Sequence, residues 1–432
     1  MTSRRLAVRV LGHPAYRRFW IGMVVSTSGT WVRQLAASVF VLADTGSAAM
    51  VGLVNFFGFI PIPFVSLLAG HVVDRTSCRG VLVRTQAVAA TISGAMAVTA
   101  LTGHLTTPLV LAGVCVLGAS YAFTKPASQA ILPELVPAHL LTDAVAMQSL
   151  QFTLGLAIGP VVAALVLRWS GTAAALGLDA ASFVVLLVAA AGLPSRAARP
   201  MTASGGARRS IGEGITFVLR RHALVVLLVG MVSSTIAIEV VKTLMPVFSV
   251  RSFGMSAGSA GLLIGAFGVG AAVGAVYAPD VRDLLGASAS GTCLAALGTS
   301  VVAFSNVRLL AVAVALLVVA GVAFQAGTVF MTSQFFEVVP EQLRGRVFAI
   351  HSLSFLGVSP FAAAASGFLA EAVGVRFSGS VTGGCALVGG AALLAHGARR
   401  GAPGAGPEEQ PSAADHDVDE GGATLPDGAE RR

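Results

Sequence analysis

Charged residues are scarce in this chain: they make up 11% of its 432 residues, whereas 55% of the residues are hydrophobic. The mean hydropathy is +0.83. A soluble protein of this length covers its core with a polar surface, which this composition cannot supply. The shortage of charge therefore excludes an ordinary soluble domain and indicates a chain that lies mostly in lipid.

The sequence also lacks the signatures of common enzyme classes. Its two lysines, Lys125 and Lys242, do not follow the glycines of a GxxxxGK(S/T) phosphate-binding loop. The eight histidines show no HExxH or other metal-ligand spacing. We therefore predict no enzyme activity, no metal and no cofactor. Any work on a solute must then draw on an ion or solute gradient.

Cysteine is rare as well. The four cysteines form no CxxC pair and are too scattered for a disulfide framework. The basic start of the chain runs into a long apolar stretch, which predicts a first membrane span rather than a cleavable signal peptide.

Long apolar runs, by contrast, fill the chain. A spanning helix needs roughly 20 mostly apolar residues, because lipid offers no partners for backbone polar groups. Such runs predict an all-α membrane protein with twelve transmembrane helices, at 19–42, 46–69, 82–101, 107–130, 144–167, 172–193, 223–248, 257–278, 284–304, 308–332, 346–370 and 377–397.

Basic residues gather in alternate short loops. Residues 1–400 hold 26 bases against 12 acids, and the excess forms no soluble stripe or patch of the kind that binds nucleic acid. The positive-inside rule places these loops and both termini in the cytoplasm, which only an even number of spans permits. We predict a multi-pass protein of the cytoplasmic membrane.

Polar stretches divide the chain into five parts. A cytoplasmic segment, 1–18, precedes a first group of spans at 19–193, and a linker at 194–222 leads to a second group at 223–397. The acidic tail at 398–432 is rich in Gly, Pro and Ala, and we expect it to be disordered. A regulatory role for the tail is the alternative.

The two groups of spans partly repeat one another. ELVPAHLLTDAVAMQSLQF at 134–152 and EVVPEQLRGRVFAIHSLSF at 337–355 match at eight positions in one register. Both segments lead from an inward-ending span into the next. This repeat predicts two pseudo-symmetric six-helix bundles, an arrangement by which transporters build a central site between repeats.

The loop after the second predicted span carries the sequence GHVVDRTSCRG. It resembles the motif of the major facilitator superfamily at the same place, through Gly70, Asp74, Arg75 and Arg79. Ser77 and Cys78 depart from that motif. The resemblance implies the major facilitator fold.

This loop has the chemistry of a cytoplasmic gate. Asp74 at a neighbouring helix N-terminus is stabilising by ~0.3–1 kcal/mol, and Arg75 is in reach of Glu134. The resemblance implies that a helix starting near Arg346 supplies that N-terminus. The second half contributes the further gate candidates Glu337, Arg344 and Arg346. The alternative is that Arg75 and Arg79 only fix the topology.

A glycine motif in the fifth predicted span points to export. GLAIGPVVAA at 155–164 resembles the GxxxGP signature of exporters in the superfamily, through Gly155, Gly159 and Pro160. Small residues four apart let helices approach closely, and a proline bends a span. Packing alone is the alternative reading. From YRRFW at 16–20 to LAEAVG at 369–374, the chain resembles the branch that holds macrolide-efflux proteins and the enterobactin exporter.

Charges at membrane depth are the candidate site. Each costs at least ~2.5–3.5 kcal/mol at a helix centre, so such residues usually pair or line a wet cavity. The resemblance implies that spans one, four, seven and ten line a central path. The candidates for transport and coupling are Arg33, Lys125, Asp179, Glu239 and Lys242, and those for the substrate cavity are Gln325, Gln334 and Trp31.

Glu239 is the predicted proton-coupling carboxylate. Its alternative is a structural pair with Lys242, three residues away on one helix face. For Asp179, a structural hydrogen bond or a pair with Arg33 is favoured over coupling. Lys125 either contacts substrate or extends to the inner membrane surface.

The sequence thus predicts a monomeric exporter of a small amphiphilic molecule, such as an antibiotic or a siderophore, in exchange for protons. An importer or uniporter of the same fold is one alternative. A non-transporting membrane sensor or assembly factor is another, from a different functional class.

Overall fold

The computed structural model describes residues 9–194, 216–339, 354–355 and 357–401, and within these ranges the protein is helical with no strand. The longer helices are α2 (Pro14–Thr45), α3 (Ala48–Phe59), α4 (Pro61–Arg75), α5 (Cys78–Leu101), α6 (Thr107–Ala130), α8 (Leu141–Ala191), α10 (His222–Thr243), α12 (Ala260–Leu285), α13 (Ala289–Asn306), α14 (Leu310–Val338), α16 (Ser359–Val373) and α17 (Val375–Gly401). Short helices are α7 (Leu132–Leu135), η1 (Ala138–Leu140), α11 (Met245–Arg251), η2 (Ala257–Ser259) and η3 (Gly286–Ser288).

Glycine and proline set the breaks between these helices. Gly46 ends α2 in the left-handed region at φ 67°, where its N–H bonds the Leu42 carbonyl. Pro61 and Pro246 lie in the first turns of α4 and α11, because proline lacks the N–H that a helix interior needs. Gly171, at φ 73°, kinks α8 between the predicted spans 144–167 and 172–193.

The predicted spans are largely helical wherever they are described. Among the described residues, eight helices are long and apolar enough to cross a membrane. The runs predicted at 19–42 and 284–304 lie in α2 and around α13, which are long enough but less apolar. Most of the run at 346–370 precedes α16, and residues 346–353 lie outside the described ranges.

Two of the five predicted parts lie mostly outside the described residues. Residues 195–215 of the linker and 402–432 of the tail are not described, and neither is most of the repeat segment at 337–355. Helix α17 continues to Gly401, four residues beyond its predicted end.

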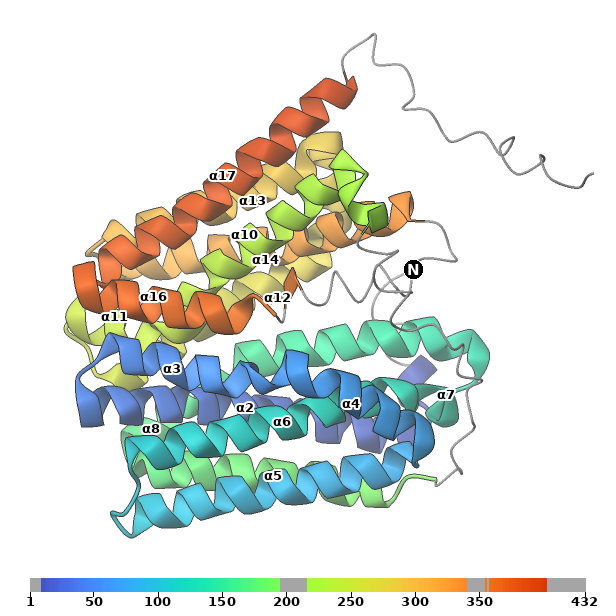
Figure 1. Cartoon of the computed structure of the whole chain (residues 1–432), viewed down its shortest axis with the longest axis vertical. Coiled ribbons are helices and arrows are strands. Elements are labelled where there is room, and N and C mark those ends of the chain that lie inside the picture. Colours follow the sequence, from blue (N-terminus) through green and yellow to red (C-terminus); the bar gives the residue numbers. More distant parts are fainter. Residues whose placement is uncertain (1–8, 195–215, 340–353, 356, 402–432) are drawn as a thin grey trace, which may run out of the picture.

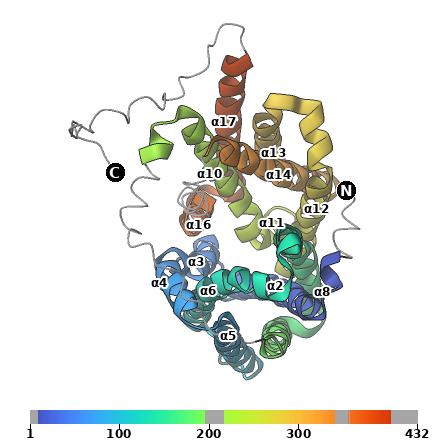
Figure 2. The same ribbon diagram turned by 90° about the vertical axis from the view of Figure 1, so that its right-hand side faces the viewer.

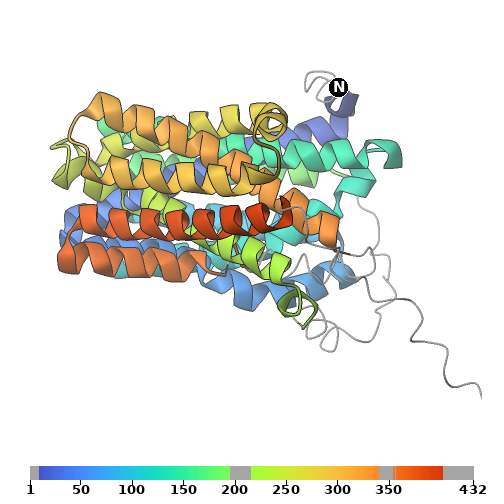
Figure 3. The same cartoon turned by 90° about the horizontal axis from the view of Figure 1, so that it is seen from above.

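The helices pack as two groups. Helices α2 to α8, the N-terminal helix group, pack mainly on one another, and α10 to α17, the C-terminal helix group, do the same (Figures 1 and 2). The first described helix begins, and α17 ends, at the same end of the molecule (Figure 3). We call this the terminal end and the other the far end.

Two helix pairs make the most extensive contacts between the groups: α3 with α16, and α8 with α12. At the first pair the backbones nearly touch. A Cβ on Gly52 of α3 would lie 2.8 Å from the Ala363 carbonyl oxygen and 3.0 Å from the Cα of Gly367, both in α16. Only glycine permits this approach, so the pair is closed by close backbone packing.

Candidate functional site

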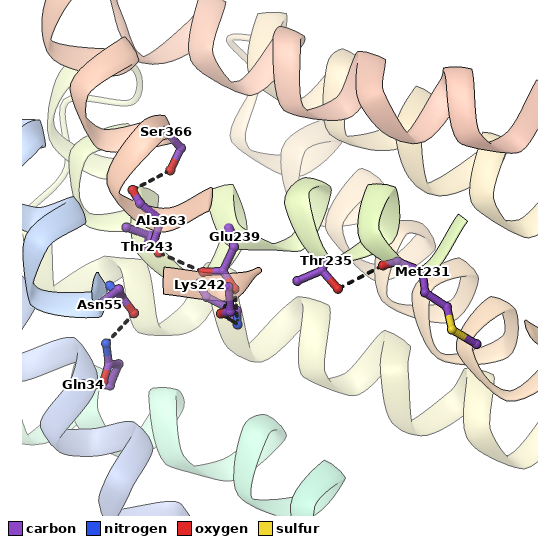
Figure 4. Close-up of polar contacts among 10 residues, drawn as sticks. Gln34, Asn55, Met231, Thr235, Glu239, Lys242, Thr243, Ala363 and Ser366 are labelled. Carbon is purple, nitrogen blue, oxygen red and sulfur yellow. Dashed lines mark hydrogen bonds and ion pairs between the residues drawn. The ribbon is translucent and has the colours of Figure 1, made fainter. Parts of the chain in front are cut away.

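A buried carboxylate lies where the two helix groups meet. Glu239, near the end of α10, is 0% exposed. Lys242 Nζ lies 2.5 Å from its Oε1. The hydroxyl of Ser359, the first residue of α16, donates to the same oxygen, and Thr243 Oγ1 donates to Oε2 over 3.3 Å (Figure 4). The spacing of three residues on one helix brings Lys242 to Glu239, whereas Ser359 arrives only through the packing of α16.

The Lys242 ammonium also reaches the N-terminal helix group. Nζ lies 5.3 Å from the centre of the ring of Phe59, the last residue of α3. It also donates to Ser359 Oγ over 3.4 Å. A cation over an aromatic face is stabilised by the ring quadrupole. One ammonium therefore links α10, α16 and α3.

An amide pair lies next to this cluster. Gln34 of α2 donates through Nε2 to Asn55 Oδ1 of α3 at 2.5 Å (Figure 4). Asn55 is 1% exposed, and its Nδ2 has no hydrogen-bond partner within the described part of the chain. Asn55 and Phe59 are one turn apart on α3, so they share a face. The sequence interpretation missed both amides, although a lone Asn in the run VGLVNFFGFI is a signal that could have found one.

A second buried ion pair lies within the N-terminal helix group. Arg33 Nε of α2 is 3.2 Å from Asp179 Oδ2 of α8, and both side chains are buried. Ser93 of α5 donates to the same Asp179 oxygen over 2.7 Å. The sequence offered this pairing as one of two structural roles for Asp179, and the structure brings the two residues together. Arg33 thus pairs with Asp179 rather than with Glu239.

Among the described residues, no hydrogen bond, ion pair or ring contact joins the remaining membrane-depth candidates to Glu239. Lys125 is exposed on α6. Gln334 of α14 is half-buried and accepts from Ser290 of α13 over 2.9 Å. Gln325 is half-buried on α14, and Trp31 packs edge-on against Phe152 with ring centres 6.3 Å apart. The structure therefore does not gather these four into one cluster.

Several of the predicted gate residues lie within the described part of the chain, where Arg75 and Glu134 do not form an ion pair. Gly70 and Asp74 lie in α4, and Arg75, at its end, is exposed. Arg79 and Glu134 are half-buried in α5 and α7.

Of the three gate candidates in the second half, one is described by the structure and two are not. Glu337 pairs with Arg282 of α12 at 3.1 Å, with both side chains exposed. Arg344 and Arg346 lie outside the described residues. The gate stays a prediction for another arrangement of the chain.

The glycine motif packs α8 against both helix groups. A Cβ on Gly159 would lie 2.6 Å from the Ser28 carbonyl oxygen and from Trp31 Cβ, both in α2, and Gly155 faces Thr27 in the same way. On the other side of α8, the Pro160 carbonyl lies where a Cβ of Gly261 in α12 would be. The motif thus provides close packing on two sides, one of them between the groups.

A charge cluster at the far end was missed by the sequence interpretation. The Glu371 carboxylate of α16 accepts from the backbone N–H of Ala48 at 2.7 Å and lies 3.7 Å from Arg251 Nη2 of α11. Arg251 in turn donates to the Gly46 carbonyl over 2.8 Å. We call Arg251, Glu371 and their contacts with the α2–α3 turn the far-end pin. It ties the C-terminal helix group to the N-terminal one.

Two bacterial transporters are similar to this chain in sequence. It is 26% identical to macrolide efflux protein A of Streptococcus pyogenes over 212 residues, 48% of this chain and 52% of that protein. It is 32% identical to the staphyloferrin A transporter of Staphylococcus aureus over 146 residues, 32% of this chain and 35% of that one. The matched stretch thus spans about half or less of each relative.

The fold has counterparts among solved structures. A bacterial homolog of the human lysosomal transporter Spinster, in an inward-facing and unoccupied conformation, superposes with a TM-score of 0.73 at 13% identity. The match covers 89% of this chain and 97% of that one. At this identity the likeness shows the fold alone.

A family model described as "transmembrane secretion effector" matches residues 7–406. That match covers nearly the whole chain and includes both helix groups. The relatives are transporters rather than enzymes, in agreement with the missing enzyme signatures. The chain therefore belongs to the transmembrane secretion effector family of major facilitator transporters, which are multi-pass membrane proteins.

Proposed function

We propose that this protein exports a small amphiphilic molecule across the cytoplasmic membrane in exchange for protons. Twelve spans in two six-helix bundles form the monomeric transporter, with both termini in the cytoplasm. The names of two relatives, one for macrolide efflux and one for staphyloferrin transport, support export of an antibiotic or siderophore. The observation that carries proton coupling is the fully buried Glu239 carboxylate at the junction of the two groups.

The junction makes Glu239 sensitive to the arrangement of the two groups. In this structure Lys242 neutralises the carboxylate, and Ser359 holds it from α16. Lys242 in turn rests on Phe59 of the opposite group. When the groups separate at this point, the carboxylate loses part of this support and becomes able to bind a proton. Arrival of substrate in the opposite state restores the ion pair and releases the proton.

The contacts between the groups favour an inward-facing state in this proposal. The contact of Gly52 with α16 and the far-end pin both join the two groups toward the far end of the molecule. If the terminal end is cytoplasmic, the far end is the closed outer side. The gate of Asp74, Arg75, Arg79 and Glu134 would then close only in the outward-facing state.

The test is transport in everted membrane vesicles, with a labelled macrolide as the first probe. Wild-type vesicles should accumulate the probe under a proton gradient and release protons when it is added. Glu239→Gln should reduce probe accumulation and proton release by more than about tenfold each, because the amide cannot carry a proton. Asp283→Asn, which removes an exposed carboxylate of α12, serves as the control and should behave like wild type. Normal coupled antiport by Glu239→Gln would exclude this assignment.

A uniporter is the second candidate, and the close Glu239–Lys242 contact favours it if the pair never separates. Counterflow distinguishes the two functions. A uniporter exchanges labelled for unlabelled probe without a pH gradient and shows no proton release, whereas net movement by the antiporter depends on the gradient.

A further inference from the structure

The buried amide of Asn55 has a donor that nothing described in the protein uses. Its Oδ1 accepts from Gln34, while Nδ2 is buried and unpartnered within the described ranges. Leaving a buried donor unsatisfied costs roughly 1–3 kcal/mol, so such groups usually bind water or a ligand. Asn55 belongs to the N-terminal helix group and lies at its junction with α16, since Gly52 on the preceding turn touches Ala363 and Gly367.

A second donor reaches the same junction from the other group. The Lys242 ammonium has three N–H donors, of which Glu239 and Ser359 account for two. Its nitrogen lies over Phe59, one turn along α3 from Asn55. Asn55 and Lys242 belong to opposite groups. Their donors therefore both lie along the same turn of α3, between Asn55 and Phe59.

The acceptors of this cluster are already engaged. Glu239 Oε1 receives Lys242 and Ser359, and Oε2 receives Thr243. The cluster therefore offers hydrogen-bond donors, and its carboxylate is already neutralised. Such a site complements an oxygen acceptor rather than an ammonium group.

Aromatic side chains continue the site on its apolar side. Phe56 packs edge-on against Phe57, with ring centres 5.4 Å apart, and against Phe361 of α16 at 5.9 Å. Phe59 lies beneath the Lys242 nitrogen and one turn from Asn55, and the Phe56–Phe361 contact adds apolar rings from both groups at the α3–α16 junction. Donors next to an aromatic wall fit an amphiphile whose polar group carries a carbonyl or carboxylate oxygen.

We propose that Asn55 and Lys242 together bind a carbonyl or carboxylate oxygen of the substrate, so that Asn55 selects acceptor-bearing amphiphiles over cationic amines. This inference rests on the proposed function in one respect only, namely that the cluster around Lys242 is a substrate site. Neither the direction of transport nor proton coupling enters it. A binding experiment therefore separates its failure from failure of the exporter proposal.

The experiment uses the purified full-length protein and three fluorescent probes that share one apolar body. They are dansylaminoundecanoate, its uncharged primary amide, and the matching dansylaminoundecyl amine. The wild-type protein should bind the carboxylate and the amide, and the amine at least about tenfold more weakly. Failure to bind either oxygen-bearing probe, or equal binding of the amine, would overturn the proposal.

Two variants of Asn55 sharpen the test. Asn55→Leu removes the donor. It should weaken binding of the carboxylate probe and of the amide probe about tenfold, the usual effect of one lost hydrogen bond in a buried site. Asn55→Asp keeps the acceptor for Gln34 but replaces the free donor by a carboxylate oxygen. It should therefore shift the preference toward the amine, a gain that simple misfolding cannot produce.

The control is Asn306→Leu. Asn306 is an exposed asparagine at the end of α13 that bonds Val302 and Ser380, away from this cluster. Its replacement should leave the affinities for all three probes unchanged. If Asn55→Leu weakened the three probes equally, or if Asn55→Asp left the preference as in wild type, Asn55 would not be the selecting residue.

Discussion

The protein holds two buried ion pairs that differ in what surrounds them. Arg33 and Asp179 pair inside the N-terminal helix group, with Ser93 of the same group as a third partner. Glu239 and Lys242 pair at the junction, with Ser359 of α16 and the Phe59 ring of the opposite group. The first pair can stay intact while the groups move relative to each other. The second cannot keep all its partners.

The difference shows that burial of a charge does not by itself identify a coupling residue. Both pairs carry the high energetic cost of charge in a membrane interior. What separates them is whether the partners belong to one rigid group or to two. On this basis we propose that Arg33–Asp179 is a brace and Glu239–Lys242 a switch, and the two can be tested against each other.

The largest effect is expected for Asp179→Leu. It leaves the buried Arg33 without its counter-charge, which destabilises a protein by roughly 3–5 kcal/mol. We expect the yield of folded protein and its melting temperature to fall sharply. The double variant Arg33→Leu/Asp179→Leu removes both charges and should recover most of the stability. If the double variant instead folded normally but lost proton-coupled transport, the pair would be more than a brace.

An effect of intermediate size is expected for a matched pair of serine variants, one at each ion pair. Ser93→Ala and Ser359→Ala each remove one hydroxyl that donates to a buried carboxylate, so each should lower stability by about 1 kcal/mol. Only Ser359→Ala should change the pH dependence of transport, because Ser359 donates to Glu239, the carboxylate proposed to couple transport to protons. Transport by both variants is measured in everted vesicles over a pH series. Equal pH profiles for the two variants would remove the distinction between brace and switch.

The smallest effect on stability is expected at the far-end pin. The Arg251–Glu371 pair is exposed, and exposed ion pairs contribute about 0–1 kcal/mol. Arg251→Ala should nevertheless favour separation of the groups at that end by a few-fold. Labelling by a membrane-impermeant maleimide reports this, at a cysteine placed at half-buried Met50 in a chain without its four native cysteines.

The control for the pin is Arg308→Ala, which removes another exposed arginine, from the turn before α14. It should leave the labelling rate of the Met50 cysteine unchanged. An unchanged rate in Arg251→Ala as well would show that the pin does not hold this end closed.

Much of the fold followed from the sequence because its signals are local. The helices of the described residues agree with the apolar runs, and Gly46 and Gly171 mark breaks that a glycine permits. The candidate site was only partly predictable. Glu239 and Lys242 are three residues apart, so helix geometry alone brings them together. Ser359 and Glu371 gave no comparable signal, because their partners are distant in the sequence, and Asn55 was marked only as a lone amide in an apolar run.

Composition and helical periodicity depend on near neighbours only, and they are enough to identify this chain as a helical membrane protein. Tertiary structure decided which charges share a site. It paired Asp179 with Arg33, brought a ring of α3 beneath Lys242, and left the Asn55 donor unpartnered among the described residues. The physical reason is that these contacts form between helices, where close packing of small residues sets which side chains meet.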